Sequence, residues 1–74
     1  MQAVIYTKDD CKWCIKAKEL FHKLDIPFVE YRINRNITRE EVLKKFPNWK
    51  TVPIIIIDDE FIGGYTELEN RLND

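Results

Sequence analysis

Two cysteines separated by two residues are the part of this sequence best suited to chemistry. They are Cys11 and Cys14, in the run Cys11-Lys12-Trp13-Cys14, and the 74 residues contain no others. A bridge between them would close too small a loop to constrain the unfolded chain, so it would stabilise the fold very little. A structural zinc ion needs four Cys or His ligands, and the chain adds only His22. Spacing alone leaves three interpretations open: half of a metal site, a redox pair, or coincidence.

The place of this pair in the chain favours the redox interpretation. A β-branched and aromatic run at residues 3–6 precedes it and predicts a buried strand. Apolar residues at helical spacing follow it and predict an amphipathic helix from about Trp13 to Leu24. A Cys-x-x-Cys motif between the first strand and helix of a βαβ unit is typical of redox proteins.

A helix N-terminus also suits a reactive thiol. Its unpaired amides and its dipole stabilise an anion, so a thiol placed there supplies more thiolate at neutral pH. Two nearby lysines strengthen this effect and two acids oppose it: Lys8, Lys12, Asp9 and Asp10. From this position Cys11 can attack a disulfide, and Cys14, one helical turn later, can resolve the mixed disulfide.

The remaining elements predict an α/β fold in the order strand, helix, strand, helix, strand, strand, helix. After the first strand and helix, we expect strands at 28–33, 54–57 and 60–62, with a turn at Asp58-Asp59. The pattern Thr38-x-x-Glu41 predicts the capping box of a short helix that Pro47 ends, and Thr66-x-x-Glu69 predicts that of a final helix. The first βαβ unit and the last hairpin together give a four-stranded mixed sheet with helices on both faces.

Composition limits the chain to one small domain and excludes several classes of partner. With 45% hydrophobic and 34% charged residues, we expect a single domain over residues 1–74. Twelve basic and thirteen acidic residues give a net charge of −1, so we expect no nucleic-acid partner. The longest apolar run, residues 52–57, is far below the roughly 20 residues of a membrane span. Without a signal-peptide pattern at the start, we expect a cytoplasmic location. We also expect a monomer.

The cysteine pair is one of three motifs that together resemble a known family. In chain order they are Tyr6-Thr7-Lys8-x-x-Cys11-x-x-Cys14, Thr51-Val52-Pro53 and Gly63-Gly64-Tyr65-Thr66-Glu67. In this order and spacing, essentially the whole chain resembles a dithiol glutaredoxin of the thioredoxin fold. The resemblance implies a central first strand, a cis peptide bond before Pro53, and a glutathione-dependent oxidoreductase that contributes to electron transfer and cell redox homeostasis. It implies no metal requirement.

The same resemblance implies a glutathione groove. Lys8 would face the glycine carboxylate, the Val52 backbone would pair with the cysteinyl part beside Thr51 and Pro53, and Trp13 would form a wall. Gly64 would allow a close approach, the amides of Tyr65 and Thr66 would bind the γ-glutamyl carboxylate, and Glu67 would meet the ammonium group. The partners implied are glutathione and disulfide-containing or glutathionylated proteins.

The sequence departs from the family pattern at two positions. Lys12 stands where proline is commonest, and Glu67 replaces the commoner aspartate. The first departure keeps a second function open, an iron–sulfur carrier in which Cys11 of two protomers and two glutathiones hold the cluster. A third is a redoxin that is reduced by thioredoxin reductase and serves ribonucleotide reductase. Outside these motifs, we expect Trp49 to be a packing residue or a partner contact.

Overall fold

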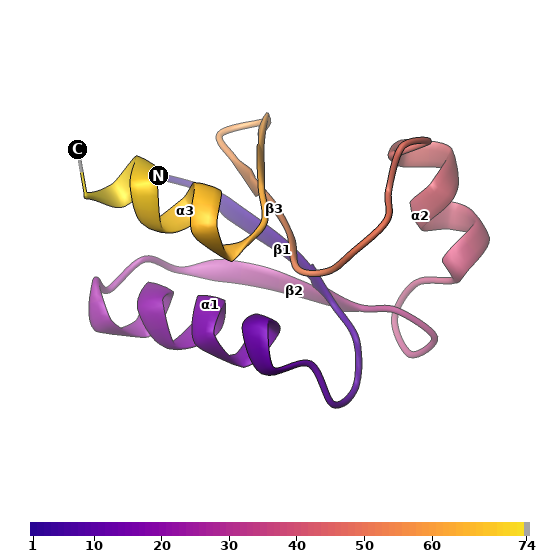
Figure 1. Cartoon of the computed structure of the whole chain (residues 1–74), viewed down its shortest axis with the longest axis horizontal. Helices are drawn as coiled ribbons and strands as arrows, with labels where there is room; N and C mark the ends of the chain where they lie inside the picture. Colours follow the sequence, from indigo (N-terminus) through magenta and orange to yellow (C-terminus); the bar gives the residue numbers. More distant parts are fainter. Residues whose placement is uncertain (74) are drawn as a thin grey trace.

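The chain forms one mixed sheet and three helices, in the predicted order. The computed structural model describes residues 1–73 (Figure 1). Its elements are β1 (Ala3–Thr7), α1 (Lys12–Lys23), β2 (Phe28–Arg32), α2 (Arg39–Lys45), β3 (Ile54–Ile57), β4 (Glu60–Gly63) and α3 (Tyr65–Leu72). The predicted α/β fold is therefore confirmed, with boundaries that differ by one or two residues.

The strands lie in the order β2-β1-β3-β4, so β1 has the central position that the resemblance implied. β1 pairs in parallel with β2, and helix α1 connects these two strands. β3 runs antiparallel to β1 and continues into the hairpin strand β4. Asp58 and Asp59 both have positive φ, the geometry of a tight two-residue hairpin turn. A short loop leads from the carboxyl end of β1 to Cys11, directly before α1.

One face of the sheet packs on α1 and α3. Helix α1 buries Cys14, Ala17 and Phe21, which lie on one side at helical spacing. Ala17 and Phe21 join Leu68 of α3 and the inward residues of β1 and β3 in the main core, which comprises Ala3, Ile5, Ala17, Phe21, Ile55, Ile57 and Leu68. This packing fixes the axis of α1 against β1, and with it the position of the cysteine pair.

The opposite face packs on the short helix α2, which lies apart from α1 and α3 (Figure 1). Its core consists of Tyr6, Ile33, Val42 and Ile54, with Phe46 and Trp49 packed against it. Trp49 is therefore a packing residue. Thr38 Oγ1 accepts the Glu41 amide at 3.1 Å, and Glu41 Oε1 accepts the Thr38 amide at 3.1 Å. The first predicted capping box is confirmed.

The second predicted capping box, Thr66 with Glu69, is wrong. Helix α3 begins at Tyr65 and its N-cap is Gly64, so Thr66 already lies inside the first turn. Glu67 takes the capping role instead, because its Oε1 accepts the Gly64 amide at 2.7 Å. Within residues 1–73, no helix is both long and apolar enough to cross a membrane.

Candidate redox site

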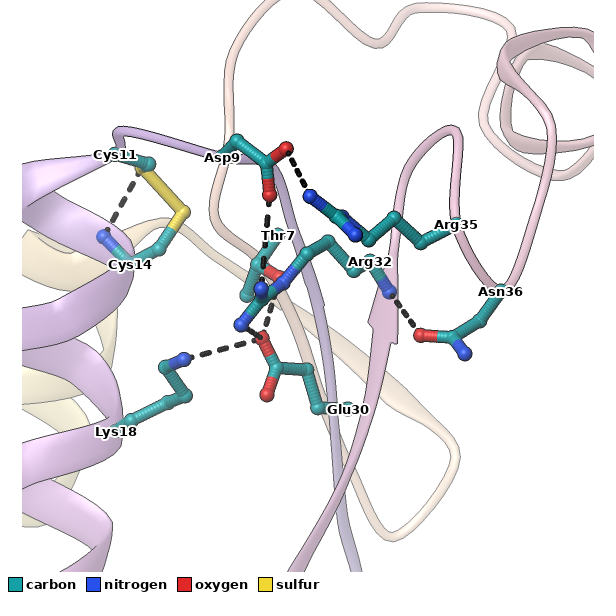
Figure 2. Close-up of polar contacts among 9 residues, drawn as sticks. All are labelled: Thr7, Asp9, Cys11, Cys14, Lys18, Glu30, Arg32, Arg35 and Asn36. Atoms are coloured by element: carbon teal, nitrogen blue, oxygen red, sulfur yellow. Dashed lines mark hydrogen bonds and ion pairs between the residues drawn. A yellow bond between two sulfur atoms is a disulfide. The ribbon is translucent and has the colours of Figure 1, made fainter.

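Cys11 and Cys14 form a disulfide at the start of α1 (Figure 2). Cys11 is the N-cap residue of the helix, with extended backbone geometry, and its sulfur accepts the Cys14 amide at 3.1 Å. Asp10 precedes it in the left-handed region, with φ of 55°. The sulfur thus occupies the position in which a capping oxygen normally satisfies the first amides of a helix. A thiolate at this position receives the same donor.

The two sulfurs differ in access from solvent. The exposed fraction is 7% for Cys11 and 2% for Cys14. Cys11 lines the groove described below and also a smaller recess of about 410 Å³, whereas Cys14 lines only that recess, beside Lys18, Arg32 and Arg35. A large disulfide substrate therefore reaches Cys11 first.

The segment before β3 forms the wall opposite the cysteines. The Cys11 sulfur lies 4.0 Å from the carbonyl oxygen of Val52, although these residues are 41 positions apart in the chain. The Val52–Pro53 peptide bond is cis, as the resemblance implied, and Pro53 is buried. Polar backbone of residue 52 is therefore presented next to the reactive sulfur.

A groove of about 520 Å³ runs from Cys11 between these walls. Its lining contains all the residues of the predicted glutathione groove: Lys8, Trp13, Thr51, Val52, Pro53, Gly64, Tyr65, Thr66 and Glu67. Asp10, Lys12 and Lys50 complete it, so the groove has three lysines and two acids, whereas the whole chain has a net charge of −1. Three segments distant in sequence thus come together around one sulfur.

The third wall of the groove is the junction of β4 and α3. Gly63 has φ of +125°, and an added Cβ there would lie 2.9 Å from Glu67 Cγ, so this turn requires glycine. The Trp13 and Tyr65 rings lie 5.5 Å apart and connect the start of α1 to the start of α3. Partial burial, together with the Glu69 carboxylate that accepts the Tyr65 hydroxyl at 3.2 Å, raises the pKa of Tyr65. Tyr65 is therefore a neutral donor at physiological pH.

A network of charged and polar side chains, which the sequence did not reveal, connects α1, β1 and β2 next to the cysteine pair (Figure 2). Glu30 Oε2 accepts the buried Thr7 hydroxyl at 2.6 Å and the Lys18 ammonium at 3.1 Å, and Arg32 lies 3.4 Å away. Burial by itself would raise the pKa of Glu30. The hydrogen bonds from Thr7 and Lys18 and the two positive charges outweigh it and lower that pKa below its ordinary value. Glu30 therefore carries a negative charge that ties α1 to the sheet.

Asp9 extends this network along the loop before Cys11. Its carboxylate lies 3.1 Å from Arg35 and 3.6 Å from Arg32, and Figure 2 shows it turned toward both guanidinium groups. Asp9, one of the two acids near Cys11 in the sequence, is therefore paired with two arginines. Among residues 1–73, no group of three or more His, Cys, Asp or Glu side chains could hold a metal ion.

Comparison with known proteins places this arrangement among the glutaredoxins. The glutaredoxin family model matches residues 3–62. Glutaredoxin 1 of Rickettsia prowazekii is 40% identical over 70 residues, which cover 90% of this chain and 73% of the relative. Glutaredoxin 3 of Escherichia coli K12 is 39% identical over 64 residues, which cover 86% of this chain and 77% of the relative.

Solved structures show the same fold. Glutaredoxin 1 from Francisella tularensis, complexed with cacodylate, superposes with a TM-score of 0.84 at 34% identity and covers 97% of this chain and 92% of its own. A buckwheat glutaredoxin–glutathione complex superposes with a TM-score of 0.81 at 22% identity and covers 97% of this chain and 68% of its own.

Proposed function

This chain belongs to the glutaredoxin family and is a thiol–disulfide oxidoreductase, and we propose that glutathione is its reductant in a Cys11/Cys14 dithiol cycle. Its substrates in this proposal are glutathione mixed disulfides and protein disulfides. We also propose that it acts as a single-domain monomer in the cytoplasm, where ribonucleotide reductase is one candidate protein substrate.

The cycle consists of four thiol–disulfide exchanges. The Cys11 thiolate attacks one substrate sulfur, forms a mixed disulfide and releases the other half of the substrate as a thiolate. The Cys14 thiolate then attacks the Cys11 sulfur and releases the second half, which leaves the Cys11–Cys14 disulfide. One glutathione thiolate opens this disulfide at Cys11 and frees Cys14. A second attacks the bound glutathione sulfur, which yields glutathione disulfide and regenerates the Cys11 thiolate.

The observation that carries this proposal is the unequal placement of the two sulfurs. Cys11 is the N-cap of α1, receives the Cys14 amide and lines the groove, which suits the attacking sulfur. Cys14 is nearly fully buried and does not line the groove, which suits a resolving thiol that attacks Cys11.

The groove also supports glutathione as the ligand. Glutathione has two carboxylates and one ammonium group, and the groove supplies three lysines, helix-end amides and two acids, of which Glu67 lies at the start of α3. We place the glycine carboxylate at Lys8, the cysteinyl part along Thr51 and the Val52 backbone beside Pro53 and Trp13, and the γ-glutamyl group at the start of α3. There the amides of Tyr65 and Thr66 would bind its carboxylate, next to Gly64, and Glu67 its ammonium.

Serine variants of each cysteine test these roles. With a glutathionylated peptide as substrate and glutathione as reductant, Cys11→Ser should lower the turnover rate at least about a hundredfold, because the attacking sulfur is lost. Cys14→Ser should keep much of this turnover, because glutathione itself can resolve the Cys11 mixed disulfide. The same variant should lose most reduction of protein disulfides. Full activity of Cys11→Ser would overturn the assignment.

Two measurements separate this proposal from the alternatives. Turnover with thioredoxin reductase, and none with glutathione, would instead favour the redoxin that is reduced by thioredoxin reductase and serves ribonucleotide reductase. Anaerobic reconstitution with iron, sulfide and glutathione tests the carrier function, and a coloured dimer that lacks disulfide reductase activity would replace the proposal. We expect a colourless monomer that turns over with glutathione.

A further inference from the structure

A second groove adjoins the first on the far side of Pro53. Its volume is about 550 Å³, and most of its wall is apolar. The apolar side chains that line it come from the end of α2, the following loop and the β3–β4 hairpin: Phe46, Pro47, Trp49, Ile54, Phe61 and Ile62. We refer to it as the apolar groove. Nothing in the proposed cycle uses it.

The apolar groove is continuous with the groove at Cys11. The two share one wall, which consists of Lys50, Thr51, Pro53, Gly64 and Glu67. Pro53 follows the Val52 carbonyl that lies beside the Cys11 sulfur. A chain that binds along residue 52 therefore continues from the reactive sulfur into apolar surroundings.

Phe61 is an exposed aromatic side chain of this groove. It is 60% exposed and lies on β4, the free edge of the sheet. Its ring lies 5.9 Å from that of Phe46, and Trp49 forms part of the lining with Arg39 stacked over its ring at 5.3 Å. Binding of a ligand that removes such an aromatic surface from water is favourable.

The chemistry of the groove indicates what it binds. Glutathione has no apolar side chain, so it can fill the groove at Cys11 but gains nothing from this one. The charged residues of its lining are two lysines and one glutamate: Lys45, Lys50 and Glu67. This excess of positive charge favours a ligand that carries an acidic residue. A polypeptide with a bulky apolar residue close to its reactive cysteine satisfies both features.

We propose that the apolar groove binds the polypeptide part of disulfide substrates and holds a bulky apolar side chain a few residues from the cysteine under attack. The proposal deepens the proposed function, since it rests on Cys11 as the attacking sulfur. It does not depend on glutathione. The groove then provides selection among protein disulfides, whereas the groove at Cys11 treats all glutathione adducts alike.

A single-turnover experiment tests the proposal without glutathione. Pre-reduced protein is mixed with short acidic peptides that contain a disulfide to a small thiol, and the second-order rate of disulfide exchange is measured. The peptides carry leucine or serine, moved one residue at a time away from the cysteine. At the matching position, leucine should raise the rate about tenfold over serine.

Matched variants locate the effect. Phe61→Thr keeps a strand-forming residue and should remove most of the leucine preference, while the serine peptide reacts as before. Val29→Thr is the control, because Val29 is 48% exposed on the same row of the sheet, through Val4 and Ile56, but lies outside the groove. It should retain the full preference.

The outcomes are distinct from those of the glutathione proposal. An equal rate for all peptides with the unaltered protein, or a preference that survives in Phe61→Thr, would overturn the apolar groove as a docking site. So would an equal loss in Val29→Thr. If peptides react with the expected preference but glutathione fails to regenerate the dithiol, the docking site stands and the glutathione proposal fails.

Discussion

The Glu67 carboxylate accepts a 2.7 Å hydrogen bond from the Gly64 amide, and this bond joins the end of β4 to the first turn of α3. It satisfies a backbone donor that a helix N-terminus otherwise leaves unpaired. The same carboxylate lines both grooves. Glu67 therefore has a structural role in addition to the proposed contact with the glutathione ammonium.

Two substitutions separate these roles of Glu67. Glu67→Gln retains an oxygen that can accept the Gly64 amide but removes the charge, so the free energy of unfolding should change by less than about 0.5 kcal/mol. The KM for glutathione should rise several-fold. Glu67→Ala should produce the same rise and also cost about 1 kcal/mol of stability through the lost cap. Urea unfolding and steady-state kinetics measure both effects, and an unchanged KM in both variants would contradict the ammonium contact.

The double glycine should respond unequally to substitution by alanine. Gly63→Ala introduces a side chain at φ of +125° and 2.9 Å from Glu67 Cγ, so we expect a loss of about 1–3 kcal/mol in the free energy of unfolding. Gly64 has an ordinary φ of −100°, and an added Cβ would lie 3.3 Å from Glu67 Oε1. Gly64→Ala should therefore cost less than about 1 kcal/mol. Equal losses in urea unfolding would contradict this account of the turn.

Stability should depend on pH through Glu30. Its pKa is lower in the folded protein than in the unfolded chain, so its contribution is complete above the unfolded value of about 4.5 and is lost as the pH falls through the folded value. Glu30→Gln should therefore cost about 1–2 kcal/mol at pH 7 and progressively less below pH 4.5. Urea unfolding at several pH values measures this difference.

Glu19→Gln is the control for the Glu30 prediction, because Glu19 lies exposed in α1 and outside the network. It should leave the pH dependence of stability unchanged. If Glu30→Gln lowered the free energy of unfolding by the same amount from pH 7 to the acid range, packing, and not ionisation, would account for the loss of stability.

Local patterns predicted the elements well because they report local geometry. The β-branched runs at residues 3–6 and 54–57 became β1 and β3, and the helical spacing of Cys14, Ala17 and Phe21 predicted the buried side of α1. The resemblance in turn implied the groove residues and the cis bond, and the structure brings these residues together around Cys11. Their contacts with glutathione stay a prediction.

What the sequence could not predict depends on contacts between distant segments. The sequence predicts a strand at 28–33, but it does not say that Val29 is exposed while Glu30 faces Lys18 on α1. Asp9 meets Arg35 across 26 positions, and only the parallel register of β1 and β2 brings them together. The apolar groove likewise forms only because Phe46, which follows α2, lies close to Phe61 of β4.

The wrong capping box has a more local cause. A threonine followed three residues later by glutamate fits Thr66 and Glu69 as well as a true box does. Glycine has no side chain with which to signal a cap, so the pattern at Gly64 was hidden. The helix begins one residue after Gly64 because β4 ends at Gly63, and strand length is set by pairing with β3.

The lysines around Cys11 give the molecule an electrostatic polarity that its net charge of −1 conceals. The groove at Cys11 has three lysines and two acids, a small positive excess, while the rest of the chain has a net negative charge, so an approaching anion is attracted toward the groove. Dissolved ions shorten the range of that attraction to roughly 10 Å at 0.1 M. The rate of first encounter with anionic thiol compounds should therefore fall as the salt concentration rises.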